Sequence, residues 1–160
     1  MSSDKENADK EKELATQIVG DLLNFLDVKP EIVTEIDEAS DDLIININVE
    51  RDAGLLIGNR GKVLNSLQLI IGVILNNKFK KWRRVIIDVS GWRNQEKRRL
   101  ESLAEVTAKR AEETGKPQYL YNLSSSQRRI IHLYLSENPR IKTESRGEGK
   151  ERCLIISSKS

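Results

Sequence analysis

One short segment joins two glycines, three positions apart, to two cationic side chains: Gly58, Asn59, Arg60, Gly61 and Lys62. Glycine allows a tight turn to present bare backbone N–H groups, and a side chain at either glycine would hold a phosphate away from those groups. The cations place positive charge where a phosphate would lie. The segment therefore predicts a backbone clamp for a nucleic acid, and a purely structural turn between two helices is the alternative.

The same segment does not fit the other glycine-rich phosphate motifs. A P-loop requires a glycine five residues before Gly61 and a Ser or Thr directly after Lys62, but the chain has Leu56 and Val63 there. The dinucleotide-binding pattern also requires a glycine in place of Leu56. Nucleotide binding through either motif is excluded.

A second cationic group combines Arg128, Arg129 and His132. Arg128 and His132 are four residues apart, so a helix would place them on one face, where they could jointly meet phosphates or stack on bases. The spacing alone favours a different interpretation, in which the single histidine is a satisfied core residue.

The sequence gives little support for catalysis or metal binding. One histidine and one cysteine cannot form a His or Cys metal cluster, and the acidic residues of the first half fall mostly in a polar tail, at strand ends and in turns. We therefore expect no enzyme activity, no metal and no cofactor. Cys153 lies in an apolar run that favours a core strand thiol over a reactive one. Trp82 and Trp92 flank a predicted strand, where packing is favoured over base stacking.

Hydrophobic periodicity predicts the elements that position the glycine segment. Apolar residues at helical or alternating spacing predict a disordered tail over 1–13, a helix over 14–26, a hairpin of 32–36 and 43–49, a short helix capped by Asp52 before the glycine turn, a longer helix over 63–74 and a strand over 85–89. The order is helix, strand, strand, helix, helix, strand.

The second half predicts a separate module. Its pattern indicates a charged helix over 93–114, a short strand over 119–123, a helix from Ser124 or Ser125 to Leu135, and a closing hairpin of 141–145 and 152–157. We expect a domain over 14–91, and a linker helix with a second domain over 92–160. The fold class is α+β.

The charge is unevenly distributed along the 160 residues. The net charge is +2, but residues 1–50 carry −10 and residues 51–160 carry +12, with +9 between Arg51 and Arg110. This favours a polyanionic partner, although a solvated face could hold the same charges. Because the N-terminus is polar and there is no long apolar run, we expect no signal peptide and no membrane insertion. The lone cysteine favours a reducing, cytoplasmic setting.

The glycine turn, in its predicted context, resembles the KH fold of the bacterial, type II αββααβ arrangement. KH domains clamp about four nucleotides of backbone with this loop, and their bases lie along a groove between helix and sheet. The resemblance implies that the segment from Gly58 to Gly61 is the clamp, with Lys62 beside it.

The whole chain from about Leu14 to Ser157 resembles the Jag (SpoIIIJ-associated) family of bacterial RNA-binding proteins. The resemblance rests on the KH-like half, on the junction Asp88–Arg93, on the helix start Gln127–His132, and on Ser145–Gly149 followed by Arg152. The C-terminal domain of that family, a small α+β domain with an antiparallel sheet, is named for an arginine and a histidine separated by three residues. It binds single-stranded nucleic acid.

This resemblance implies a single-stranded RNA-binding protein, an RNA chaperone or post-transcriptional regulator linked to cell elongation and envelope biogenesis. Arg128 and His132, with Arg129 and Arg146, would extend the RNA site. Relatives can pair with a small single-KH protein. The oligomeric state is left open.

Two departures and two alternatives accompany this interpretation. Many members carry a further N-terminal domain where we expect only a dozen polar residues, and residues 120–126 lack the turn proline that the family leads us to expect. A single-stranded DNA binder is one alternative. The other is a ribosome- or protein-associated adaptor that uses the acidic N-terminal half as its interface.

Overall fold

The computed structural model describes residues 2–159, with side chains from Glu6 to Lys159. The chain forms two compact units, unit 1 over Met1–Arg93 and unit 2 over Asn94–Ser160. Both mix helices with a three-stranded sheet, which confirms the α+β fold class. Within the described part of the chain, no helix has the length and apolar character needed to cross a membrane.

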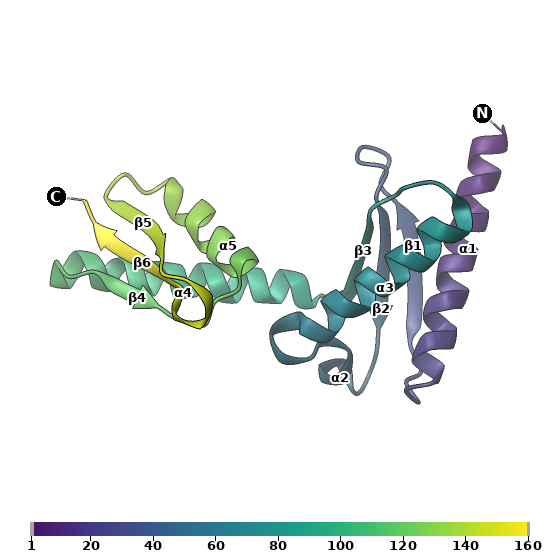
Figure 1. The fold of residues 1–160 in the computed structure, drawn as a ribbon, viewed down its shortest axis with the longest axis horizontal. Coiled ribbons are helices and arrows are strands. Elements are labelled where there is room, and N and C mark those ends of the chain that lie inside the picture. Colours follow the sequence, from purple (N-terminus) through teal and green to yellow (C-terminus); the bar gives the residue numbers. More distant parts are fainter. Residues whose placement is uncertain (1, 160) are drawn as a thin grey trace. The chain divides into compact units, whose positions relative to one another are not determined.

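Unit 1 has the predicted αββααβ order (Figure 1). Its elements are α1 (Ser2–Asn24), β1 (Glu31–Ile36), β2 (Leu43–Asn48), α2 (Ala53–Ile57), the 3₁₀ turn η1 (Asn59–Gly61), α3 (Lys62–Phe79) and β3 (Val85–Val89). The strands β1 and β2 form the predicted antiparallel hairpin, and β3 pairs in parallel with β2. A parallel pair requires a crossover connection, which α2 and α3 supply.

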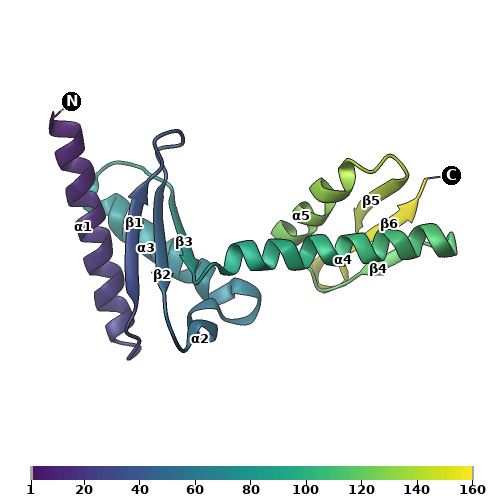
Figure 2. The same ribbon diagram turned by 180° about the vertical axis from the view of Figure 1, so that it is seen from behind.

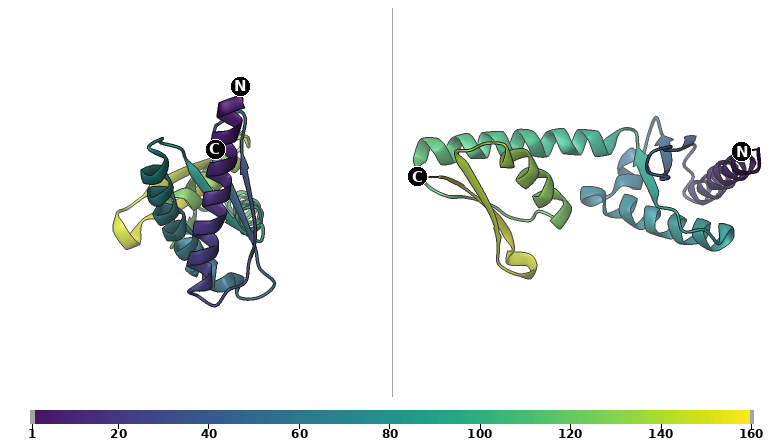
Figure 3. Two further views of the ribbon diagram at one scale, coloured as in Figure 1. Left: turned by 90° about the vertical axis from the view of Figure 1, so that its right-hand side faces the viewer. Right: turned by 90° about the horizontal axis from the view of Figure 1, so that it is seen from above.

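The core of unit 1 lies on one face of this sheet. Alternate residues of β2 and β3 are buried, as expected for a sheet covered on one side: Leu43, Ile45, Ile47, Val85, Ile87 and Val89. The helices α1 and α3 lie on the same side of the sheet (Figure 3). Val19 and Leu23 of α1 and Ile71 of α3 join the buried strand residues in one cluster.

The predicted disordered tail over 1–13 is wrong for the described residues, because α1 begins at Ser2. Ion pairs at helical spacing support its first turns, with Lys10 Nζ 2.8 Å from Glu6. Glu11 is buried against the guanidinium of Arg83, which also lies 3.0 Å from Asp41. The polar segment is therefore held by a buried cation that is distant in sequence.

The turn between β1 and β2 is fixed by Asp37. Its carboxylate accepts hydrogen bonds of 2.8 Å from the backbone N–H groups of Ser40 and Ala39, which lower the pKa of this carboxyl group below its ordinary value. This is the side-chain-to-backbone bonding that favours aspartate in turns.

Unit 2 contains two helices and a fully antiparallel sheet of order β4-β6-β5, as expected. Its elements are α4 (Trp92–Thr114), whose first two residues belong to unit 1, β4 (Gln118–Leu120), α5 (Ser125–Ser136), β5 (Ile141–Arg146), the 3₁₀ turn η2 (Gly149–Glu151) and β6 (Cys153–Ser158). β4 is shorter than the strand predicted over 119–123. Cys153 is buried in β6, as predicted, but it lies outside the main buried cluster of unit 2.

Both helices of unit 2 pack on one face of its sheet. Figure 1 shows the strands in front of α4, and Figure 2, from behind, shows α4 in front of the strands. Leu100 of α4, Ile131 of α5 and the strand residues Leu154 and Ile156 belong to one buried cluster. Within the described part of unit 2, no helix lies against the opposite face of the sheet.

Candidate nucleic-acid interface

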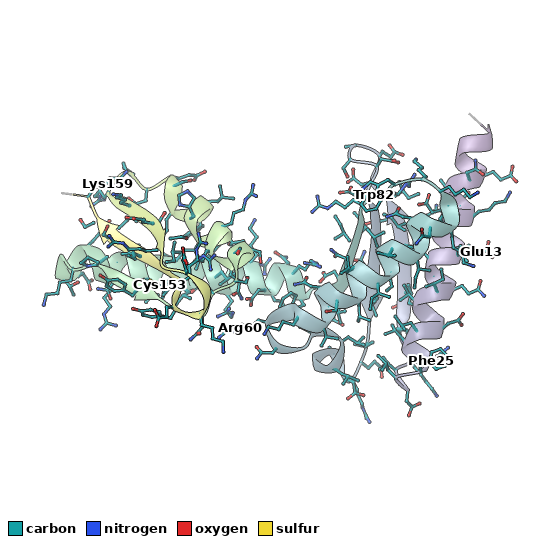
Figure 4. All side chains as sticks on the ribbon, in the orientation of Figure 1. Glu13, Phe25, Arg60, Trp82, Cys153 and Lys159 are labelled. Carbon is teal, nitrogen blue, oxygen red and sulfur yellow. The ribbon has the colours of Figure 1, made fainter. Side chains whose placement is uncertain are left out.

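The glycine segment forms a left-handed turn between α2 and α3. Gly58, Arg60 and Gly61 have φ angles of 68°, 55° and 76°. Asn59, Arg60 and Lys62 are exposed, and Figure 4 shows Arg60 on this loop. Gly61 occupies the N-cap position of α3, so the positive end of an 18-residue helix adds to the charge of the two cations. The turn therefore offers a surface suited to a phosphate.

The amide groups of the glycines differ from the expected bare donors. The N–H of Gly58 donates to Gly54 O at 2.8 Å, and the N–H of Gly61 donates to Gly58 O at 3.4 Å. The N–H of Lys62 bonds to Asn59 O. We therefore assign the attraction for phosphate to the exposed side chains and the helix end rather than to the glycine amides.

Internal packing explains why both positions are glycine. A Cβ atom at Gly58 would lie 2.8 Å from Cβ of Val63, and one at Gly61 would lie 2.7 Å from Cζ3 of Trp92. Both distances are shorter than real Cβ contacts, and both glycines also have positive φ. The indole of Trp92 thus packs beneath the loop.

The junction after β3 holds Trp92 in place. The guanidinium of Arg93 donates to Ile87 O at 2.7 Å and to Oε1 of Gln68 at 2.8 Å, while Asp88 accepts from the backbone N–H of Arg93. Burial lowers the pKa of the Arg93 guanidinium, and nearby Asp88 opposes that shift. These supporting contacts had no signal in the sequence, because nothing in the spacing connects the glycine loop with a residue 31 positions later.

Two expectations for unit 1 are wrong. Asp52 precedes α2 but has a φ of 64° and makes no side-chain capping bond. Trp82 is 84% exposed rather than packed, whereas Trp92 packs against the core as predicted. Figure 4 shows Trp82 beyond the end of α3 that lies away from Arg60.

In unit 2, Arg128 is buried at the start of α5. Its Nη1 donates to the backbone oxygen of Leu123 at 2.7 Å, and its Nη2 donates to Oγ of Ser125 at 3.2 Å. The guanidinium therefore fixes the segment that leads into α5. Its burial could not be predicted from the spacing with His132.

His132 is exposed, so the core interpretation that its spacing favoured is wrong. Its Nδ1 shares a hydrogen bond with Oγ1 of Thr143 on β5, which orients the ring. Both residues line a hollow of about 390 Å³, together with Ser125, Arg128, Arg129, Ser145, Arg152 and Leu154. The structure thus gathers three arginines and the histidine around one depression.

A capping box positions this part of α5. Oγ of Ser124 accepts from the N–H of Gln127, and Gln127 Oε1 accepts from the N–H of Ser124 at 2.9 Å. The amide Nε2 of Gln127 also donates to Glu96 of α4 at 2.7 Å. The predicted cap is confirmed, without the proline that the family resemblance led us to expect.

Arg146 lies apart from the hollow. On β5, Thr143 and Ser145 line the hollow, so the alternation of a strand places Arg146 on the opposite face of the sheet. Arg152, which the site prediction omitted, takes its place among the lining residues. The alternation within the closing hairpin was the available sequence signal for this difference.

A hollow elsewhere in unit 1 does not suit an anion. It has a volume of about 640 Å³, and its charged lining residues are Asp27, Glu31, Glu50 and Asp52 against Lys29 and Arg51. Among the described residues, no group of three or more His, Cys, Asp and Glu side chains is arranged to hold a metal ion. The two cationic surfaces are thus the strongest candidates for an interface.

Comparison with known proteins supports the same division of the chain. The family model described as the KhpA/KhpB KH domain matches residues 12–87, and the model of the R-3-H domain, named for its Arg-x-x-x-His motif, matches residues 98–158. An RNA-binding protein KhpB from Clostridium symbiosum is 30% identical over 91% of this chain and 65% of its own length. The protein of that name from Bacillus subtilis is 40% identical over 67% of this chain and 52% of its own length.

A third relative, RNA-binding protein KhpB from Streptococcus pneumoniae, is 27% identical over 92% of this chain and 45% of its own length. The chain thus spans between about half and two thirds of these relatives. The two matched domains follow each other in the same order as the αββααβ unit and the unit with Arg128 and His132. With a KH domain of the KhpA/KhpB type followed by an Arg-x-x-x-His domain, the chain belongs to the Jag (SpoIIIJ-associated) family.

Proposed function

We propose that this protein binds single-stranded RNA, without catalysis, through one cationic surface in each unit. The observation that carries the proposal is the exposed pair Arg60 and Lys62, set on a left-handed loop at the N-terminus of α3 in a KhpA/KhpB-type KH domain. Cations at a helix N-terminus attract the phosphate backbone, whatever the base sequence. Gly58, Asn59 and Gly61 shape this loop.

The second surface is the hollow of unit 2. The exposed Arg129 and Arg152 supply charge, and His132 supplies an oriented imidazole edge. When Nδ1 of His132 accepts the hydroxyl proton of Thr143, the ring proton lies on Nε2, where it can be donated to a phosphate or base. Arg128 acts mainly by holding this geometry.

The family and the names of the relatives support RNA as the ligand. We propose a post-transcriptional or RNA-chaperone role in the cytoplasm, connected with cell elongation and envelope biogenesis, and pairing with a small single-KH protein. Competition between RNA and DNA oligonucleotides of matched sequence separates RNA recognition from DNA recognition. Preference for RNA supports this assignment.

The proposal predicts that Arg60→Asp with Lys62→Asp weakens RNA binding at least tenfold and leaves the fold intact. Aspartate tolerates the left-handed conformation of residue 60, and an acidic residue at the first position of α3 is favourable to the helix. Fluorescence anisotropy with a labelled single-stranded RNA measures the affinity, and circular dichroism checks the fold.

Lys78→Asp with Lys80→Asp is the matched control. Lys80 also has a left-handed φ, of 51°, and the pair lies at the far end of α3, about 27 Å from the loop for an 18-residue helix. The net charge changes by the same amount. Equal loss of affinity in both double variants would mean that overall charge, rather than the loop, controls binding.

A further inference from the structure

The open face of the sheet in unit 2 carries a pair of exposed tyrosines. Tyr119 and Tyr121 are 52% and 57% exposed, although they alternate with Leu120, which packs against the core. Their rings are nearly parallel, with an interplanar angle of 16° and centroids 6.3 Å apart. Two of the chain's seven aromatic residues thus form a ladder on the surface.

Strand register defines the neighbours of this pair. Tyr119 is paired with Ile155 of β6, and Ile155 with Glu144 of β5. The next row toward the hairpin end joins Cys153 of β6 to Arg146 of β5. Adjacent strands are about 4.8 Å apart, so roughly 10 Å separates the tyrosine strand from the strand of Arg146.

This face is suited to single-stranded nucleic acid by its charge and chemistry. Lys142 and Arg146 are exposed on β5 on either side of Glu144, and unit 2 carries 14 basic against nine acidic residues. Aromatic rings stack on any base, and nearby cations meet the backbone phosphates. The tyrosines would take bases while Arg146 meets a phosphate of the same short stretch.

The face is also continuous with the hollow that contains His132. Ser145 and Arg152 line the hollow, and the residues next to them in the strands, Arg146 and Cys153, alternate to the open face. The end of the hairpin therefore offers a path from the hollow to the open face.

From this arrangement we propose that Tyr119 and Tyr121 form a base-stacking platform. The platform extends the RNA site of unit 2 across the open face of its sheet, and Arg146 meets a phosphate of the RNA beside it. This inference rests on the proposed RNA-binding function and deepens it. It also gives Arg146, which is absent from the hollow, a place in the interface.

The test uses a double variant of the full chain that carries both Tyr119→Ala and Tyr121→Ala. Its affinity for labelled oligouridine RNA is compared with that of wild type by anisotropy titration. Loss of two stacked bases is expected to weaken binding roughly thirtyfold or more. The double variant Tyr119→Phe with Tyr121→Phe should bind within about twofold of wild type, because phenylalanine also stacks. Tyr134→Ala is the matched control, since Tyr134 is 41% exposed on α5.

Photocrosslinking of wild type to iodouridine-substituted RNA provides a measurement without mutation. The tryptic peptide 111–128 contains both tyrosines and no other aromatic residue, whereas Tyr134 lies in the peptide 130–140. We expect crosslinks in peptide 111–128.

The outcomes separate the platform from the proposed function. One outcome would overturn the platform proposal alone. In it, the double variant Arg60→Asp with Lys62→Asp loses RNA binding, but the double variant Tyr119→Ala with Tyr121→Ala binds RNA like wild type. Crosslinks confined to other peptides would likewise overturn the platform alone. Failure of wild type to bind single-stranded RNA would overturn both the proposed function and the platform.

Discussion

At the scale of single residues, the arginine and histidine of the Arg-x-x-x-His motif have different environments. Arg128 is buried and donates to Leu123 O and Ser125 Oγ, whereas His132 is exposed beside Thr143. The arginine is therefore tied to the folding of the helix start, and the histidine remains available to a ligand.

This difference predicts separate effects on stability and binding. Arg128→Ala leaves the part-buried carbonyl of Leu123 without its donor and should lower the free energy of unfolding by about 1–3 kcal/mol. His132→Ala should change stability by less than about 0.5 kcal/mol, as surface substitutions do, while weakening RNA binding several-fold. Urea denaturation and anisotropy measure the two quantities. Greater destabilisation by His132→Ala than by Arg128→Ala would contradict this assignment.

At the scale of elements, the loop and the junction after β3 form one structure. Gly61, at the end of the turn, packs against Trp92. The next residue, Arg93, fixes the start of α4 by hydrogen bonds to Ile87 and Gln68. The shape of the glycine loop thus depends on a tryptophan from the start of α4.

Gly61→Ala tests that dependence. The positive φ and the contact with Trp92 should together lower the free energy of unfolding by about 2 kcal/mol. Adding Trp92→Leu should recover part of the affinity and order of the loop, because the smaller side chain makes room for Cβ. Thermal denaturation and RNA titration measure both effects. If the double variant instead loses stability and affinity by the sum of the two single losses, the two residues are not coupled through this contact.

The order of the elements could be predicted, because alternating residues such as Leu43 and Ile45 and the glycines between two helices leave strong local patterns. Contacts between distant segments could not. Neither Arg83 beneath Glu11 nor Trp92 beneath Gly61 follows from local spacing. Periodicity likewise shows which residues share a helix face, but not which of them the sheet will cover, as the burial of Arg128 illustrates.

At the scale of the whole molecule, the charge is divided between the units. Unit 2 carries a net charge of +5, while unit 1 carries −3 and concentrates its cations after Arg51. A net charge of only +2 therefore conceals two local cationic surfaces. We infer that affinity comes from several phosphate contacts distributed over both units rather than from the overall charge.

The salt dependence of RNA affinity tests this central claim most directly. Contacts with several phosphates predict that affinity falls roughly tenfold or more between low and physiological salt. Neutralising two contacts with Arg60→Asn and Lys62→Gln should reduce the slope of log affinity against log salt by about 1.4. A flat salt response of wild type, or an unchanged slope in this variant, would contradict the account.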